Sequence, residues 1–577
     1  MDQSIYISKI NKIFHDLYKS YEDKNDLKFY SSEISNLIKD FNRRTKLSKN
    51  LIIDEKLSVL ITYADNITAG KNKKKLKIFK SFYERFLKNY FNTIHFLPFY
   101  PSSSDSGFSV KDHCEVDSKL GTWQDIKDLS KYNSIMADIV INHSSSRGIW
   151  FKNFLLNKSP GNDYFFTIDK KKFNSKNVVR PREHKLLKKI KIRNKTTYLW
   201  RTFSPDQIDL NFKNPKVLIR FIKIMFFLIN RGVNIFRLDA IAYLWKESGT
   251  KCINHSNTHK IIKLLRIICS NLKQKKILIT ETNLPEKQNL SYFGKNDQAN
   301  WIYNFSLPPL IIKSLLFENG SELTKWSKKF PCLKKGTSYL NFLASHDGVG
   351  MRPVEGLLSK PTLNKLFNRL KKNGGEFSYR KINGSKKQVY EANITLFNAF
   401  KASDFDESGN YSLERYLAAH SIILSFEGVP AFYFNSLFGT SNDISKFIIT
   451  DNKRDLNRYK WNNERLIKNL KINNSKQSVF YNEMTNLIKI RRKQKAFHPN
   501  AQRKNLNFGS KFYALERISL DKSQKILAIT NLTSKTQVLK IDSKYLKSKN
   551  LLSQKLKITF DKELVFNPFQ TFWLSIN

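Results

Sequence analysis

Apolar runs that end in polar or charged residues recur along the chain. Four of them cover residues 137–143, 232–240, 276–283 and 339–348, and helix-like sequence separates each run from the next. Each run is typical of a buried strand, and strands that alternate with helices predict a parallel sheet. Polar residues at the carboxyl ends of such strands are typical of the active site of a (β/α)8 barrel. We therefore expect a (β/α)8 barrel in the α/β fold class.

The second of these runs places Arg237 and Asp239 two residues apart. On a strand both side chains point to the same side, which favours a site but is also compatible with a structural ion pair. The other polar ends have equally plain alternatives: a helix N-cap for Asp138, a surface acid for Glu281 and a loop position for Asp347. Four such ends in order favour a common site.

A set of short motifs carries a resemblance to a known family. They are Asp105-Ser-Gly-Phe108, Leu120-Gly-Thr-Trp123, Arg237-Leu-Asp239-Ala240, Lys246-Glu-Ser-Gly-Thr250, His346-Asp-Gly-Val-Gly350, Gly428-Val-Pro430 and Arg454-Asp-Leu-Asn-Arg458. Over roughly residues 55 to 500 the chain resembles the sucrose phosphorylase branch of the α-amylase superfamily, glycoside hydrolase family 13. Residues 279–283, 289–294 and 345–356 look most like the glucosylglycerate phosphorylases of that branch.

The resemblance implies a retaining mechanism with three carboxylates. Cleavage of an α-glucosidic bond with retention needs two carboxyl groups about 5–5.5 Å apart, on either side of the anomeric carbon. By the resemblance, Asp239 is the nucleophile, Glu281 is the general acid/base, and Asp347 holds the sugar hydroxyls. We expect Arg237 to lower the pKa of Asp239, and nearby carboxylates and burial to raise the pKa of Glu281.

Further positions of a glucose pocket carry over in the same way. They are Asp105 and Arg458 for the far hydroxyls, His143 and His346 as hydrogen-bond donors to the ring, Phe108, Phe203 and Tyr243 as an apolar wall, and Gln207 on the rim. An apolar wall suits a cation-like transition state and keeps water from the covalent intermediate. Ordinary core positions remain the alternative for Phe203 and for the two histidines.

The carboxylates alone do not decide which acceptor opens the glucosyl intermediate. The resemblance implies a glycosyltransferase that uses phosphate to convert sucrose or glucosylglycerate into α-glucose 1-phosphate and fructose or glycerate. Arg352, five residues after Asp347, suits phosphate or a carboxylate acceptor, with a surface arginine as the alternative. A hydrolase or transglucosidase with the same carboxylates is the second hypothesis. An inactive basic scaffold that binds nucleic acid is the third.

The chain is long enough for a barrel with accessory parts. The expected organisation is a helical N-terminal extension over residues 1–52, a barrel over 53–142, 211–350 and 413–495, a B-domain insertion after the third strand over 143–210, a second, lid-like insertion over 351–412, and an all-β C-terminal domain over 496–577. Residues 6–18 show helical spacing of apolar side chains, and short strand-like runs such as 511–516 and 525–531 recur near the end.

The charge of the chain is strongly positive. It has 101 Lys+Arg against 49 Asp+Glu, a formal net charge of +52. Nucleic-acid-binding proteins concentrate such charge on one face, whereas lysines here are scattered over all segments. We interpret the charge as a compositional bias toward lysine and expect no specific nucleic-acid partner.

Other features of the sequence indicate where in the cell the protein is expected and which cofactors it is expected to lack. The four cysteines lack paired metal-ligand spacing, which favours reduced thiols. The N-terminus lacks the pattern of a signal peptide, and the apolar run near residues 221–230 is too short to span a bilayer. We expect a cytoplasmic monomer or homodimer with no membrane partner, no metal and no cofactor apart from phosphate as co-substrate. Its partners should be a small sugar substrate and phosphate.

Overall fold

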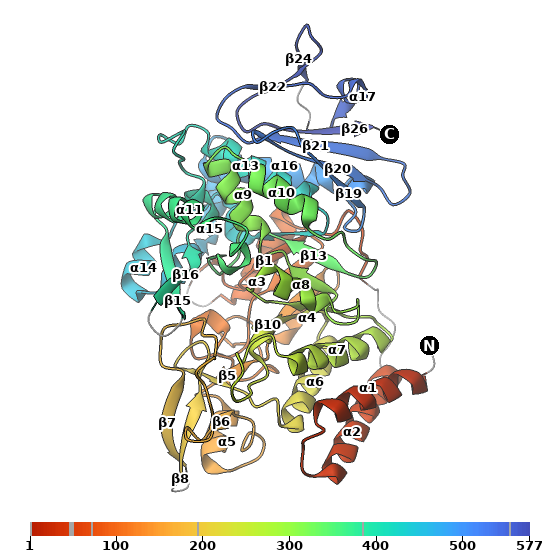
Figure 1. Cartoon of the computed structure of the whole chain (residues 1–577), viewed down its shortest axis with the longest axis vertical. Helices are drawn as coiled ribbons and strands as arrows, with labels where there is room; N and C mark the ends of the chain where they lie inside the picture. The colour runs from red at the N-terminus through yellow and green to blue at the C-terminus, as the bar shows by residue number, and fades with distance from the viewer. Residues whose placement is uncertain are drawn as a thin grey trace.

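The computed structural model describes residues 3–44, 51–70, 73–192, 195–382, 386–552 and 556–576. A central barrel carries a β-rich insertion on one side, two N-terminal helices beside it and a sheet-rich C-terminal region at the opposite end (Figure 1). The prediction of an α/β barrel with a C-terminal β region is confirmed.

Eight parallel strands close the barrel. In chain order they are β1 (Val59–Thr62), β3 (Thr93–Phe96), β4 (Ser134–Val140), β10 (Val233–Asp239), β11 (Ile277–Thr280), β12 (Trp301–Tyr303), β13 (Ser338–Asn341) and β17 (Val429–Tyr433). The first strand pairs with both the second and the last, which removes any free sheet edge. Because all strands run the same way, their carboxyl ends meet at one face of the barrel.

Helices cover the outside of the barrel between successive strands. The main ones are α3 (Lys75–Phe86), α4 (Trp123–Ser130), α6 (Pro215–Asn230), α7 (Ser256–Asn271), α9 (Leu307–Leu316), α13 (Ser412–Ser425) and α16 (Lys476–Arg491). The residues at the start of α6 explain why the helix begins at Pro215. The side chain of Asn214 accepts the backbone N–H of Lys216, and Pro215, which lacks an N–H, takes the first helical position.

An insertion follows β4, the third strand of the barrel. It contains β5 (His143–Ser145), α5 (Ile149–Leu156), β6 (Thr167–Ile168), β7 (Leu187–Ile192), β8 (Lys195–Trp200) and β9 (Gln207–Asp209). Strands β5 and β9 pair antiparallel, so the start and end of the insertion lie side by side at the barrel mouth. Phe166, Ile168, Trp200 and Cys252 form its small core.

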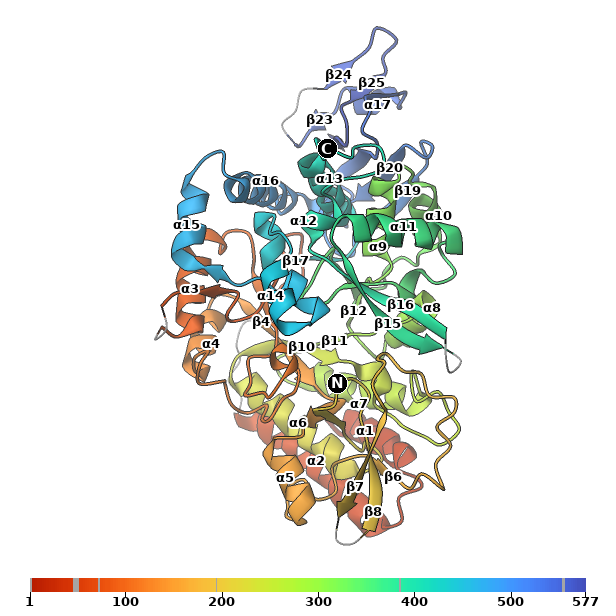
Figure 2. The same ribbon diagram turned by 90° about the vertical axis from the view of Figure 1, so that its left-hand side faces the viewer.

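A second insertion follows β13 and contributes to the same face. It comprises β14 (Val349–Gly350), α11 (Lys360–Lys372) and a hairpin of β15 (Glu376–Ile382) with β16 (Lys386–Asn393), whose strands pair antiparallel. Gly348 lies so close to this hairpin that a Cβ atom there would come within 2.7 Å of the Ala392 carbonyl oxygen. The hairpin is therefore packed directly against the loop that carries Asp347. Figure 2 shows the hairpin of β15 and β16 above the strands β7 and β8 of the first insertion.

The two ends of the chain pack on the barrel separately. The N-terminal helices are α1 (Gln3–Leu17), which packs on α7, and α2 (Lys24–Arg44), which packs on α6. Between α2 and α6, the rings of Phe41 and Phe226 stack with their centroids 4.9 Å apart. At the other end, a five-stranded sheet is formed by β19 (Gln502–Leu506), β20 (Phe512–Ile518), β21 (Lys525–Asn531), β26 (Thr571–Ile576) and β23 (Lys549–Asn550). A smaller sheet contains β22 (Gln537–Leu539), β25 (Leu564–Phe566) and β24 (Lys557–Ile558). Arg517 fastens this region by donating from Nη1 to the Ser425 carbonyl oxygen at 2.7 Å.

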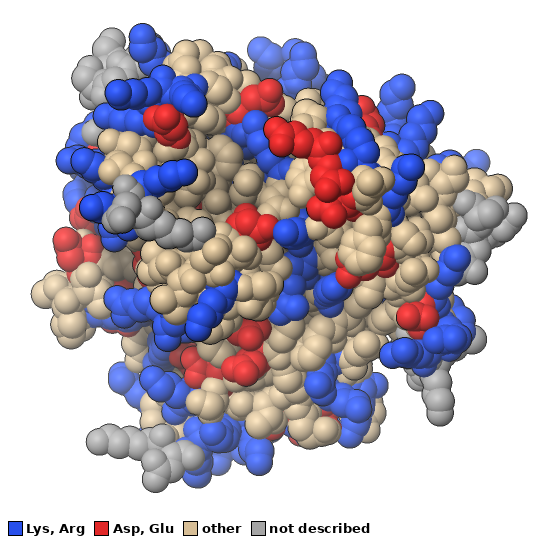
Figure 3. Space-filling model, turned by 90° about the horizontal axis from the view of Figure 1, so that it is seen from below, with Lys and Arg blue, Asp and Glu red and all other residues tan. Residues whose placement is uncertain are grey.

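The surface charge and the helices relate to two further expectations: scattered lysines and no segment that spans a membrane. Lys and Arg side chains are spread over the whole face seen in Figure 3, with Asp and Glu side chains among them. Among the helices that the structure describes, none is long and apolar enough to cross a membrane. That the basic surface has no specific nucleic-acid partner stays a prediction.

Candidate active site

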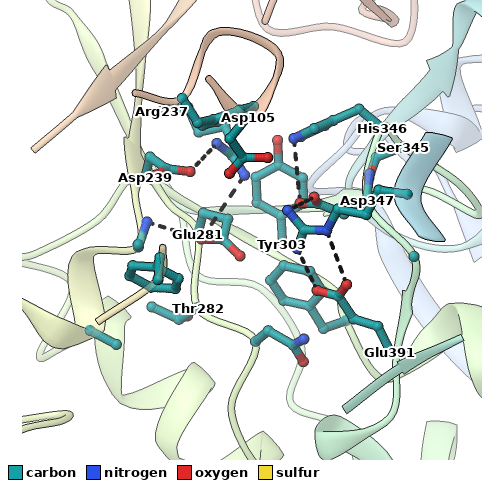
Figure 4. Close-up of a pocket in the computed structure, with 18 of the residues that line it drawn as sticks. Asp105, Arg237, Asp239, Glu281, Thr282, Tyr303, Ser345, His346, Asp347 and Glu391 are labelled. Atoms are coloured by element: carbon teal, nitrogen blue, oxygen red, sulfur yellow. Dashed lines mark hydrogen bonds and ion pairs between the residues drawn. The ribbon is translucent and has the colours of Figure 1, made fainter. Parts of the chain in front are cut away.

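A cavity opens at the carboxyl ends of the barrel strands and gathers most of the predicted site residues. Its lining includes Asp105, Phe108, His143, Phe203, Gln207, Arg237, Asp239, Tyr243, Glu281, His346 and Asp347. Figure 4 shows the three carboxylates Asp239, Glu281 and Asp347 around this cavity. Of the predicted positions, all of which the structure describes, Arg352 and Arg458 lie outside the lining.

The register of two neighbouring strands builds the first half of the site. Arg237 on β10 stands directly opposite Asp138 on β4, and its Nη1 atom contacts the Asp138 carboxylate. The same Nη1 atom donates to Asp239 Oδ1 at 2.7 Å. Asp138 is fully buried and also lies 2.9 Å from His95 Nε2. The guanidinium is thus locked between two carboxylates, which fixes the orientation of Asp239.

The general-acid candidate lies on the next strand along. Glu281 directly follows β11, and its Oε2 atom accepts the backbone N–H of Ala240 at 3.0 Å. The same oxygen lies 4.0 Å from Arg237 Nη2. One guanidinium therefore lies between Asp239 and Glu281, so the two carboxyl groups face the same small volume.

The two carboxyl groups hold protons more tightly than ordinary acids. Burial, reinforced by Asp347, raises the pKa of Glu281, as the sequence predicts. Burial also raises the pKa of Asp239; Arg237 opposes this increase, and the charge of Glu281 adds to it. The expectation of a lowered pKa for Asp239 is therefore wrong in direction. The loss of hydration at a buried strand end outweighs the attraction of a guanidinium that is already shared with Asp138.

The third carboxylate has a different environment. Burial alone would raise the pKa of Asp347, but Arg454, His346 and Arg458 lower it below its ordinary value. Arg454 Nη1 lies 2.9 Å from Asp347 Oδ1, and Arg458 Nη2 lies 3.7 Å from the same oxygen. His346 Nε2 lies 3.4 Å from Asp347 Oδ2, while burial lowers the pKa of that imidazole. Asp347 is thus held as an anion that can accept hydrogen bonds from sugar hydroxyls.

A strained loop positions Asp105. Asp105 and Ser106 have φ angles of 52° and 49°, in the left-handed region that L residues rarely adopt, and Gly107 follows at 107°. A Cβ atom on Gly107 would lie 2.6 Å from the Pro98 carbonyl oxygen, so the turn needs glycine there. Asp105 Oδ2 accepts from Gln207 Nε2 at 3.3 Å. Gln207, predicted on the rim, is in fact buried because its amide also reaches the Phe108 carbonyl.

Aromatic rings and imidazoles form the walls of the cavity. Phe108 stacks on His346 with ring centroids 4.9 Å apart, and Phe203 meets Tyr243 edge-on at 5.1 Å. His143 lies 5.5 Å from the Phe203 ring, and its Nε2 atom lies 3.0 Å from the Phe108 carbonyl oxygen. These rings combine apolar surface with the electron-rich faces that suit developing positive charge on a sugar ring.

Comparison with known proteins places this site in a family. The model of the α-amylase catalytic domain matches residues 86–347. The glucosylglycerate phosphorylase of Escherichia coli is 36% identical over 523 residues, covering 90% of this chain and 92% of that protein. The chain belongs to the α-amylase family. The resemblance inferred from the sequence is confirmed, and the chain is an enzyme of the phosphorylase branch.

More distant members of the family agree. The sucrose phosphorylase of Bifidobacterium adolescentis is 27% identical and covers 71% of this chain and 81% of its own length. The crystal structure of sucrose 6F-phosphate phosphorylase from Thermoanaerobacter thermosaccharolyticum superimposes with a TM-score of 0.72, at 23% identity. That superposition covers 84% of this chain and 95% of the other. It supports the barrel fold of the family member described here.

Two predicted arginines of this α-amylase-family enzyme lie behind the lining. Arg458 reaches the site from outside: it donates from Nε to the His346 carbonyl oxygen at 3.0 Å and lies 3.7 Å from Asp105 Oδ1. Arg352 is buried, and within the described part of the chain its Nε and Nη1 atoms have no hydrogen-bond partner. Burial raises the pKa of Tyr243, and the charge of Arg352 is the largest influence that opposes this increase. Arg352 is therefore a buried cation near Tyr243 rather than a surface arginine.

Sequence reasoning does not single out four further lining residues: Arg182, Tyr303, Glu391 and Arg454. A signal existed for Arg454, which opens the same motif as Arg458. Glu391 lies in an alternating strand-like run, where a lone carboxylate on the inner face is informative. Arg182 is hidden by the lysine-rich composition around it, and Tyr303 looks like an ordinary core position on β12.

The structure also bears on the expected absence of a metal. Among the described residues, no group of three or more His, Cys, Asp or Glu side chains is arranged to hold a metal ion. Lys246, which follows β10, places its Nζ atom 2.8 Å from both Asp209 Oδ2, at the end of the first insertion, and Asn142 Oδ1, just before its start. The chain thus places its own cation between these oxygens. Independence from metals stays a prediction.

Proposed function

We propose that this enzyme is a retaining α-glucosyl phosphorylase whose donor is glucosylglycerate and whose products are α-glucose 1-phosphate and glycerate. The observation that carries the proposal is the 36% identity to a glucosylglycerate phosphorylase over 90% of the chain. Sucrose phosphorylases in the same comparison reach only 26–29%. Sucrose is therefore the second candidate donor.

The geometry supports a two-step mechanism, in which the nucleophile and the acceptor approach the anomeric carbon from opposite sides. Asp239 attacks the anomeric carbon and forms a glucosyl ester, while Glu281 gives its proton to the departing glycerate oxygen. Glu281 then takes the proton from the incoming phosphate as that oxygen replaces Asp239. Two inversions at the same carbon give net retention. The raised pKa of Glu281 suits the first step because the acid must carry its proton near neutral pH.

The glucosyl subsite is the polar half of the cavity. Asp347, held as an anion by Arg454, and Asp105, beside Arg458, face the region where sugar hydroxyls bind. Their hydrogen bonds favour the distorted ring of an oxocarbenium-like transition state. Burial lowers the pKa of both His143 and His346, so each imidazole is neutral and has one N–H. The Phe108 carbonyl oxygen accepts that of His143.

Both proposed acceptors are anions, so one cationic subsite serves both half-reactions. Arg182 lines the cavity, with its guanidinium 5.4 Å from the centre of the Tyr390 ring. Arg352 lies behind this lining near Tyr243, and its Nε and Nη1 groups, which lack a partner among the described residues, suit a phosphate oxygen or the carboxylate of glycerate. The ring pair of Phe203 and Tyr243 limits the access of water, which favours phosphorolysis over hydrolysis.

One assay separates the three hypotheses. The enzyme is incubated with glucosylglycerate or with sucrose, with and without phosphate, and glucose 1-phosphate and free glucose are measured. Glucose 1-phosphate that depends on phosphate and forms faster from glucosylglycerate supports the proposal. Free glucose alone would indicate a hydrolase, and no product from either donor would leave the inactive basic scaffold. An Asp239→Asn variant gives the background.

A further inference from the structure

Glu391 is a buried carboxylate that no step of the proposed mechanism uses. It lies on β16 of the second insertion, is 3% exposed and lines the cavity. Its two oxygens accept from Arg454: Nη2 donates to Oε1 at 2.7 Å and Nε donates to Oε2 at 3.2 Å. This is a two-bond, charge-assisted pair, the geometry that fixes a guanidinium in one plane.

The other end of the same guanidinium faces the sugar-binding carboxylate. Arg454 Nη1 lies 2.9 Å from Asp347 Oδ1, on the side opposite its contacts with Glu391. In Figure 4, Glu391 and Asp347 lie on the same side of the cavity, and dashed lines lead from the Glu391 carboxylate toward Asp347. The backbone around Asp347 is held by the same segment, since Asn457 Nδ2 donates to the Asp347 carbonyl oxygen at 3.0 Å.

The pair also joins two separate parts of the chain. Arg454 belongs to the short helix η6 (Lys453–Asn457), whereas Glu391 belongs to the hairpin of the second insertion. Lys453 adds a second link by donating from Nζ to the Phe377 carbonyl oxygen at 2.6 Å. The hairpin is therefore fastened to the segment that carries the arginines of the glucosyl subsite.

We propose that Glu391 is a positioning residue that holds Arg454 against Asp347 and so aligns Asp347 for binding of the glucosyl transition state. Glu391 acts through Arg454 and does not contact the acceptor. The inference rests on the proposed glucosyl transfer and adds to it a role for the second insertion. Loss of the charge on Glu391 should slow formation of the glucosyl-enzyme while leaving phosphate binding unchanged.

The test uses α-D-glucosyl fluoride, a donor whose leaving group needs no proton and no acceptor subsite. Fluoride release in the first turnover is measured for the wild type and for Glu391→Gln. We expect the rate to fall about tenfold, since a charge-assisted pair is replaced by a neutral hydrogen bond. The KM for phosphate should change less than twofold. An unchanged rate of fluoride release, or a loss confined to the KM for phosphate, would overturn the inference.

The control is Glu355→Gln. Glu355 holds the same hairpin, because its carboxylate accepts from Arg380 Nη2 at 2.8 and 3.0 Å, but it does not line the cavity. We expect less than a twofold change in fluoride release. An equal loss in both variants would mean that anchoring of the hairpin in general is what matters, and would overturn a specific role for Glu391.

A second background tests whether Glu391 acts through Arg454. In an Arg454→Lys enzyme the two-bond pair is already lost, so adding Glu391→Gln should lower fluoride release less than threefold further. A full tenfold loss there would contradict the inference. If Glu391→Gln does not fold, Glu391→Asp, which withdraws the carboxylate by one methylene, should slow the same step, and an unchanged rate would again overturn it. A wild type that releases no fluoride would instead contradict the proposed function.

Discussion

The backbone N–H of Ala240 donates to Glu281 Oε2 at 3.0 Å, which ties the acid/base candidate to the residue directly after Asp239. Ala240 has a φ of 50°, an uncommon conformation for a residue with a Cβ atom. Such strain costs on the order of 1–3 kcal/mol and persists where surrounding contacts enforce it. The strained residue fixes the relative position of the two carboxyl groups that must act on one bond.

The role of Glu281 predicts a dependence on the leaving group. Glu281→Gln should lower kcat/KM for glucosylglycerate at least about 100-fold, since general acid catalysis contributes that much or more. The rate of fluoride release from α-glucosyl fluoride should fall far less, because fluoride leaves without a proton. Initial rates with both donors check this. Equal losses with both donors would assign Glu281 to binding rather than to proton transfer.

The pKa shifts predict the pH profile. Activity needs the pair of Asp239 and Glu281 to hold one proton, with Asp239 ionised. Raising the pH removes that proton, so kcat/KM falls on the basic side; lowering the pH protonates Asp239, so it falls on the acid side. Because burial raises both pKa values, both limbs should lie above the ordinary carboxyl values of about 4.

The donor again supplies the control for the pH profile. With α-glucosyl fluoride the basic limb should disappear, because the departing group needs no acid, while the acid limb should remain. The same basic limb with both donors would show that some other group titrates there. Asp347 should not contribute to either limb, since its pKa is lowered.

The acceptor subsite predicts a selective effect of Arg182. Arg182→Gln should raise the KM for phosphate about tenfold or more while leaving first-turnover fluoride release within twofold, because the guanidinium is assigned to the acceptor. Arg147→Gln removes the same charge from an exposed position in the same insertion and should change neither value. An unchanged KM in Arg182→Gln would remove this residue from the phosphate site, and Arg352→Gln would then be the next variant to measure.

The buried position of Lys246 predicts that its replacement lowers the stability of the fold. Its ammonium is buried between Asp209 and Asn142, so Lys246→Ala leaves a buried carboxylate without its cation. The free energy of unfolding should fall by about 3–5 kcal/mol, measured by denaturant unfolding. Lys216→Ala, which removes a largely exposed pair with Asp163 at 3.0 Å, should cost less than about 1 kcal/mol. Equal small losses would show that Lys246 does not hold the insertion.

The sequence predicts the barrel well because the barrel follows from local patterns. Residues such as Asp239 and Glu281 stand at the ends of apolar runs, and strand ends meet at one face of a parallel barrel. Even the C-terminal strands at 512–518 and 525–531 match or overlap the runs at 511–516 and 525–531 that predict them.

What the sequence does not predict depends on contacts between distant segments. The pairing of Glu391 with Arg454 joins residues 63 positions apart in the chain, and no periodicity reveals it. The direction of the Asp239 pKa shift depends on how fully the strand end is buried and on how Asp138 shares Arg237. Both are properties of the packed structure rather than of any single motif.

Trapping of the glucosyl-enzyme tests the central claim most directly. The enzyme is treated with 5-fluoro-α-D-glucosyl fluoride, which forms a slowly released ester, and the labelled peptide is identified by mass spectrometry. The account predicts one added 5-fluoroglucosyl group on the carboxyl group of Asp239, lost on addition of phosphate as activity returns. A label on another residue, or steady turnover of this donor by an Asp239→Asn enzyme, would contradict it.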